Sequence, residues 1–212
     1  MKMNLKNRNL RKLKLIRIRF NSRNLFIFLV SFSIVSLIIG MLFYFFLNSS
    51  DKVLIDKNVL SLFVIGENYD YFSLFKNSFL ENTFSLFLIW ILGISVIGVL
   101  FVIFIYFFHV FSIGFSIASL FSNYGVKGIV ASFCYLFPSK LFYLIILFLV
   151  SFFAIRVSYK IIKLCFTKEE IKIRDDMRKY FNVLLVSFFV MFAISLMEVF
   201  IDPFLIKLFT YI

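Results

Sequence analysis

The side chains best suited to chemistry in this sequence are few, and they lie in or beside long apolar runs. His109 is the single histidine. An ionisable group in an apolar run is a candidate for function, although a neutral imidazole near a helix end costs little. Lys140 follows Pro138 by two residues, and its long stem lets the ammonium group extend to a membrane interface. A structural role is the favoured interpretation at both positions.

Glu198 and Asp202 form a second candidate site, because residues four apart share one face of a helix. Two carboxylates can relay protons, but this pair stands beside Pro203 at the expected outer end of a span. An interfacial cap or a contact with a partner is therefore favoured. Cys134 lies in an apolar segment and Cys165 in a charged one, which argues against a disulfide and, with one histidine, against a zinc site.

Recognisable catalytic motifs are missing from the sequence. It contains no H-E-x-x-H, no G-x-S-x-G, no Walker loop and no second histidine to accompany a nucleophile. We therefore predict no catalytic, metal-binding or cofactor-binding residues, and a protein that is not an enzyme.

The elements that must position these residues are set by an extreme composition. The chain is 62% hydrophobic, and residues 82–126 form a run of 45 without Asp, Glu, Lys or Arg. A core helix of a soluble domain keeps a polar face toward water, and this run has none. The sequence predicts an all-α, polytopic integral membrane protein with about five transmembrane helices.

The net charge of +12 is unevenly distributed. Residues 1–24 are predicted to form a basic cytosolic arm, because basic residues next to a span mark the cytosolic side. The arm also suits anionic lipid headgroups, and its position beside a span argues against a nucleic-acid partner. It contains nine basic residues and no acidic one: Lys2, Lys6, Arg8, Arg11, Lys12, Lys14, Arg17, Arg19 and Arg23.

Two fixed points set the expected topology. Residues 25–47 can span once, which places the acidic 48–81 segment outside the cell as an extracytoplasmic loop. Residues 156–180 are rich in Lys and Arg and belong in the cytosol. Residues 82–155, which carry only Lys127 and Lys140 as charges, must then cross an odd number of times, and their length fits three.

Residues 181–201 complete the expected spans, and residues 202–212 form an extracytoplasmic tail too short to return. Within the central region, Gly93, Gly98 and Gly114 are expected bend points, and Ser122 to Gly128 should form a turn. Pro138 predicts a kink or the start of a new helix, because proline donates no backbone hydrogen bond. Gly114 and Ala118 have the spacing of small residues that lets helices pack closely.

Three stretches resemble the stage II sporulation protein M family: "NSFLENTFSLFLIWILGISVIG", "GFSIASLFSNYGVKGIVASFCYLFPSKL" and "SLMEVFIDPFLIK". The resemblance covers nearly the whole chain. The positions that match the family pattern, as scaffold residues and not as a catalytic set, are Asn77, Trp90, Gly93, Gly98, Gly114, Pro138, Glu198 and Pro203.

The resemblance implies a mother-cell membrane protein of endospore formation. It would act in engulfment of the forespore, at the septal membrane, as a scaffold for two cell-wall hydrolases, stage II sporulation proteins D and P. In the wider family, His-Gly often follows the proline. Here Ser139 and Lys140 follow Pro138, which places the chain nearer the endospore-former branch.

Two questions stay open in the sequence. The aromatic residues of the 48–81 segment (Tyr69, Tyr71, Phe72 and Phe75) can dock a partner or form an aromatic belt at the headgroups. The alternative function is a small permease or transporter subunit, favoured by Pro138 and His109, because discontinuous helices often mark binding sites in transporters. The absence of an internal repeat and the scarcity of buried charges argue against it.

Overall fold

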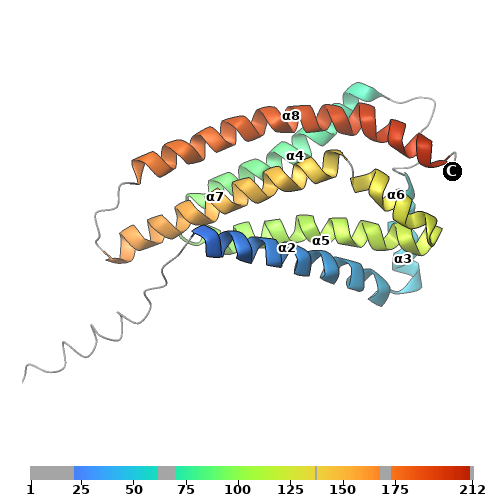
Figure 1. Ribbon diagram of the computed structural model, residues 1–212, viewed down its shortest axis with the longest axis horizontal. Coiled ribbons are helices and arrows are strands. Elements are labelled where there is room, and N and C mark those ends of the chain that lie inside the picture. The colour runs from blue at the N-terminus through green and yellow to red at the C-terminus, as the bar shows by residue number, and fades with distance from the viewer. Residues whose placement is uncertain (1–21, 62–69, 137, 168–172, 211–212) are drawn as a thin grey trace, which may run out of the picture.

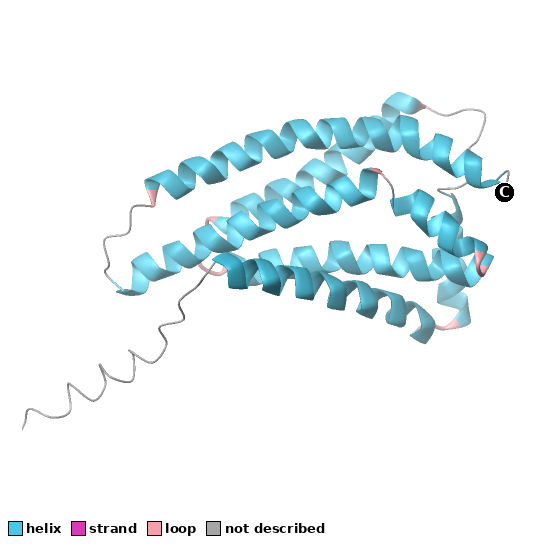
Figure 2. Ribbon diagram, viewed as in Figure 1, coloured by secondary structure: helices cyan, strands magenta, loops and turns pink. Residues whose placement is uncertain are grey.

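The computed structural model describes residues 22–61, 70–136, 138–167 and 173–210. All regular structure in these residues is helical, and no strand occurs among them (Figure 2). The helices are α2 (Ser22–Phe46), α3 (Ser49–Ser61), α4 (Tyr71–Gly93), α5 (Gly98–Tyr124), α6 (Lys127–Leu136), α7 (Ser139–Thr167) and α8 (Arg174–Thr210).

Five long helices, α2, α4, α5, α7 and α8, lie roughly side by side in one elongated bundle (Figure 1). Four of them, α2, α5, α7 and α8, are long and apolar enough to cross a membrane. α4 is long as well, but Lys76 and Glu81 interrupt its first half. The predicted class, an all-α polytopic membrane protein, is confirmed.

The bundle has two ends, which we call the α6 end and the Gly93 end. The α6 end holds α3, α6, the first turns of α4 and the last turns of α8, and it lies to the right in Figure 1. The Gly93 end, to the left, holds the start of α2, Gly93, the start of α5, the end of α7 and the start of α8. Residues 71–81 of the expected loop are therefore helical and continuous with residues 82–93.

α8 extends beyond the expected span of residues 181–201 in both directions. It begins seven residues earlier, inside the charged segment, where Asp175 and Asp176 occupy the first turn and interact favourably with the helix dipole. Asp176 also pairs with the ammonium group of Lys160, and its other oxygen lies 3.9 Å from the Arg156 guanidinium. These ion pairs connect the start of α8 to the second half of α7.

The core combines large apolar side chains with buried serines. In lipid, helix association relies on close packing and interhelical hydrogen bonds, because the surrounding tails are as apolar as the core. Buried serines, which are small enough for close packing, accompany the apolar residues on most of the long helices, as at Ser36, Ser116, Ser151 and Ser195. Ser36 and Ser116 donate to carbonyls of their own helices. The largest fully buried apolar side chains include Leu29, Leu86, Ile89, Leu147, Val150, Met191 and Ile194.

α2 and α5 approach each other at two glycines. A Cβ atom at Gly40 would lie 2.2 Å from the Phe111 carbonyl oxygen, and one at Gly114 would lie 2.2 Å from the Leu37 carbonyl oxygen. Each glycine therefore makes room for the backbone of the opposite helix. The close packing predicted from Gly114 is confirmed, and Ala118, one turn later, is buried as well.

The orientation of the bundle across the membrane is a prediction that labelling can test. Lys57 is exposed on α3, at the α6 end, and the native Cys165 is exposed near the end of α7. In a Lys57→Cys, Cys134→Ser variant, a membrane-impermeant maleimide should label position 57 in intact cells. Cys165 should react only after permeabilisation. Labelling of both from the same side would contradict the five-helix topology.

Candidate functional site

The helical segment that runs from the α6 end toward the Gly93 end is broken between α6 and α7. α6 ends at Leu136 and α7 begins at Ser139, directly after the buried Pro138, whose carbonyl accepts a 3.2 Å bond from the Phe142 amide. Proline has no amide hydrogen and disfavours helical conformation at the residue before it. Of the two outcomes predicted at Pro138, a kink or the start of a new helix, the structure shows the second. The break brings the next two side chains, Ser139 and Lys140, to two acids of α8.

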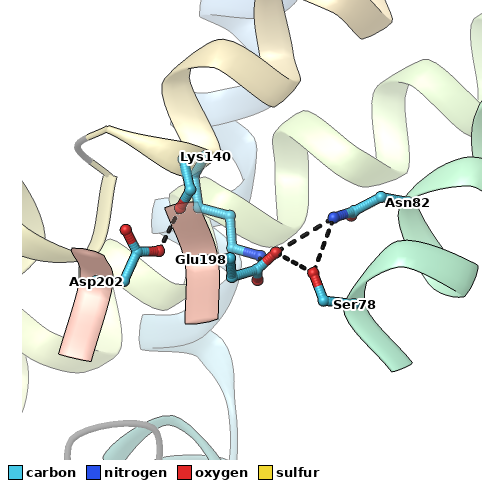
Figure 3. A network of polar contacts seen from close by, with 6 residues as sticks. Ser78, Asn82, Lys140, Glu198 and Asp202 are labelled. Carbon is cyan, nitrogen blue, oxygen red and sulfur yellow. Dashed lines mark hydrogen bonds and ion pairs between the residues drawn. The ribbon is translucent and has the colours of Figure 1, made fainter. Parts of the chain in front are cut away.

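An ion pair between Lys140 and Glu198 stands at this break (Figure 3). The Lys140 Nζ lies 2.5 Å from Glu198 Oε1. Glu198 Oε2 accepts bonds from Ser78 Oγ at 2.5 Å and from Asn82 Nδ2 at 3.2 Å. The two charged side chains are 25% and 23% exposed, so water screens them only in part. The cluster joins α4, α7 and α8 through one carboxylate.

Asp202 lies one turn beyond Glu198, on the same face of α8 as its spacing predicts. Its Oδ2 accepts a hydrogen bond from Ser139 Oγ. Its Oδ1 is buried and has no hydrogen-bond partner among the described residues. The donors to Glu198 therefore come from α4 and α7, whereas the donor to Asp202 comes from α7.

His109 of α5 lies between α4 and the second turn of α7. Its Nδ1 lies 2.9 Å from the Ile105 carbonyl, which can only accept, so Nδ1 carries the proton and donates. Its Nε2 lies 3.1 Å from Ser85 Oγ, whose single proton can go either to Nε2 or to the Glu81 carbonyl, also 3.1 Å away. The imidazole also lies 5.8 Å from the ring of Tyr143, which follows Lys140 by one turn. Both ring nitrogens of His109 thus bond groups of α4 and α5.

The contacts of this cluster run between helices. The serines of the cluster, Ser78 and Ser139, donate to carboxylates and lie against no imidazole, so they lack the base that activates a serine nucleophile. Within the part of the chain that the structure describes, no three His, Cys, Asp or Glu side chains gather as metal ligands would. The cluster holds the first turns of α4 against α7 and α8.

The residues of the family pattern lie mostly where helices meet. Trp90 stacks on Tyr180 with ring centroids 5.9 Å apart, and the Tyr180 hydroxyl donates to the Trp90 carbonyl at 2.9 Å. Ser158 Oγ donates to the Gly93 carbonyl at 2.6 Å. These bonds satisfy carbonyls that the end of α4 leaves without an intrahelical partner. A Cβ at Gly93 would lie 2.1 Å from the Tyr180 oxygen.

The remaining pattern positions differ in their surroundings. A Cβ at Gly98 would lie 1.6 Å from the Leu92 carbonyl oxygen, so the turn between α4 and α5 has no space for one. Asn77 is exposed on α4, one residue before Ser78. Pro203 lies within α8.

The expected partner-contact residues gather at the α6 end. Tyr71 is 52% exposed and stacks in parallel on Phe200 of α8, with centroids 5.9 Å apart. Phe72 is 75% exposed. Phe75 packs edge-on against Phe192 and so belongs to the contact between α4 and α8. Tyr69 lies outside the described residues.

Some residues of the site went unnoticed in the sequence. Ser78 and Asn82 are four apart on α4, and this spacing, which places both on one helix face, was an available signal. A second polar contact, around Asp56, joins residues whose spacing in the sequence gives no indication that they meet. Asp56 of α3 accepts bonds from the Tyr44 hydroxyl at 2.9 Å and from Ser119 Oγ at 2.6 Å, which seats α3 on the ends of α2 and α5.

The fold and the site together define a polytopic membrane protein whose polar groups are used to join helices. The family model described as "Stage II sporulation protein M" matches residues 25–203, most of the chain. The chain belongs to this family of sporulation membrane proteins. No curated protein and no solved structure matches it.

Proposed function

We propose that this protein is a non-enzymatic membrane anchor that holds peptidoglycan hydrolases, stage II sporulation proteins D and P, at the engulfing septal membrane during endospore formation. In this proposal the α6 end faces the extracytoplasmic side and the Gly93 end faces the mother-cell cytosol. The basic residues at the Gly93 end, Arg156, Arg174 and Arg178 among them, support that orientation.

The observation that carries the proposal is an aromatic surface at the α6 end. Tyr71 and Phe72 of α4 and Phe200 of α8 are each more than half exposed, and Tyr71 stacks on Phe200. Aromatic side chains are enriched in the cores of protein interfaces, where they bury a large area with little loss of conformational freedom. Residues at least 128 positions apart in sequence thus form one surface that a partner can cover.

The polar cluster supports this role by fixing the surface. Ser78 and Asn82 lie about two and three turns beyond Tyr71 on α4, and both bond Glu198, which lies two residues before Phe200 on α8. The two helices that supply the aromatic rings are therefore cross-linked next to those rings. A docking surface held in place before binding loses less entropy when the partner arrives.

Deletion and aromatic variants test the proposal in sporulating cells that express fluorescently tagged hydrolases. Deletion should leave both hydrolases present but mislocalised, with engulfment stalled. Tyr71→Ala and Phe72→Ala should each weaken partner capture, because truncation of an aromatic interface anchor often costs about 2 kcal/mol, roughly thirtyfold in affinity.

Phe189→Ala is the matched control, because Phe189 is equally exposed, at 72%, but lies in the apolar middle of α8. It should leave hydrolase localisation unchanged. His109→Ala, inside the bundle, should also change localisation little. Hydrolases correctly placed in the complete deletion would refute the anchor.

The broken helix favours one alternative function, a small permease. Discontinuous helices with charged groups at the break are typical of solute sites in transporters, and Pro138, Lys140, Glu198 and Asp202 form such a break here. In that case deletion would leave the hydrolases at the septum, and the purified protein in vesicles would move a solute in a way that Glu198→Gln abolishes.

A further inference from the structure

A shallow apolar groove opens at the α6 end between α2, α5 and α6. Its volume is about 320 Å³, and its walls are Met41, Phe45, Ile117, Ala118, Phe121, Ile129 and Ser132. Ser132 Oγ already donates to the Gly128 carbonyl at 2.7 Å, so the groove presents no unsatisfied hydroxyl. An apolar cavity of this kind does not hold water well.

One of the residues that line the groove is small and buried: Ala118 of α5. α6 turns back from α5 at Gly125, whose φ of 58° permits the sharp reversal. Met41 and Phe45 of α2 and Ile129 of α6 stand as opposite walls.

The position of the groove along the helices limits what can fill it. Its wall residues on α2 start five residues before the end at Phe46, and those on α5 start seven residues before the end at Tyr124. At 1.5 Å per residue the groove extends only about 8 to 10 Å from the helix ends. A transmembrane helix needs a track along its whole length. The groove suits the part of an acyl chain that lies just below a lipid headgroup.

Two lysines stand at its rim. Lys52 Nζ donates to the carbonyl oxygen of Phe45, a wall residue, at 3.2 Å, and it lies 5.6 Å from the centre of the Tyr44 ring. Lys127 is the exposed first residue of α6, two positions before the wall residue Ile129. Of the nearby acids, Asp56 is bonded to Tyr44 and Ser119, and Asp51 is exposed in the first turn of α3.

We propose that this groove is a binding site for one anionic phospholipid, with an acyl chain between α2 and α6 and the headgroup phosphate beside Lys52 and Lys127. The apolar walls fit the chain, and the two ammonium groups fit the phosphate. The site is separate from the aromatic surface of Tyr71 and Phe200, so its existence does not depend on the anchoring function.

Photo-crosslinking of the full chain in vesicles tests the site. The vesicles are phosphatidylcholine with a small fraction of phosphatidylglycerol that carries a diazirine in its acyl chain, and adducts are mapped by mass spectrometry. Adducts should concentrate on Met41, Phe45, Phe121 and Ile129. Ile129→Trp and Ile117→Trp, which fill the groove from its walls, should lower them several-fold, whereas Val186→Trp, on the exposed face of α8, should not.

The headgroup is tested with a second probe, phosphatidylcholine with the same diazirine chain. The wild-type chain should favour the phosphatidylglycerol probe, and Lys52→Gln and Lys127→Gln should each reduce that preference by up to about fivefold. Retained thermal stability of the variants in detergent shows that they fold. Adducts spread evenly over the lipid-facing helices, equal labelling by both probes, or crosslinks to a second copy of the chain at these residues would each overturn the proposal.

Discussion

Replacing Lys140 by Met is expected to lower the free energy of unfolding by about 3 kcal/mol in bicelles. The substitution keeps most of the side-chain volume but leaves the Glu198 carboxylate without its counter-charge, and removal of one partner of a buried pair typically costs 3–5 kcal/mol. Because both side chains are about a quarter exposed, the lower end of that range applies. Ser78 and Asn82 retain their bonds to Glu198, and they soften the loss without replacing the charge.

A double-variant cycle isolates the interaction. Glu198→Leu together with Lys140→Met removes both charges, and a well-packed apolar pair often equals the ion pair it replaces, so the double variant should be more stable than Lys140→Met alone. Lys76→Met is the matched control, because Lys76 is exposed on α4, and its effect should stay within about 0.5 kcal/mol. Equal stability of Lys140→Met and the control would show that the pair does not hold the helices.

Replacing Gly40 or Gly114 by Val should destabilise the bundle by about 3 kcal/mol, at the upper end of the cost of overpacking. The obstacle in each case is a backbone carbonyl of the opposite helix, 2.2 Å from the new Cβ, and a backbone cannot rotate away as a flexible side chain can. α2 and α5 would have to separate along this contact. Lipid supplies no compensating hydrophobic force between them.

The two glycine variants should also be non-additive. Once Gly40→Val has moved the helices apart, the space opposite Gly114 is already larger, so the double variant should lose less than the sum of the single losses. Val35→Ile adds one methyl group to an exposed, lipid-facing position of α2 and serves as the control. Steric-trap unfolding in bicelles measures all four proteins. Additive losses would mean that the two glycines act at independent contacts.

The α-helical membrane architecture could be predicted from the sequence because lipid leaves the backbone few choices. A segment such as residues 82–126, without a charge, must satisfy its amides and carbonyls within itself, and a helix does so locally. Local rules also predicted the start of a helix after Pro138 and the turn around Gly125, where φ is positive. Each of these features depends on residues that are neighbours in the chain.

The helix faces that meet could not be predicted in the same way. In a soluble protein the apolar stripe shows which side of a helix is buried, but in lipid both sides are apolar: Phe28 and Ile34 of α2 are exposed, whereas Leu29 is fully buried. The pairing of Lys140 with Glu198 joins residues 58 positions apart, and the stack of Tyr71 on Phe200 joins residues 129 positions apart.

The sequence by itself therefore determined that this chain is a bundle of membrane-spanning helices, where one of them breaks, and which family it resembles. The tertiary structure alone decided that Lys140 meets Glu198, that Gly40 and Gly114 face the opposite backbones, and that the aromatic rings of α4 and α8 form one surface. The physical reason is that helix formation in lipid is driven by hydrogen bonds within each segment, whereas helix pairing depends on close packing and on a few polar contacts between distant segments.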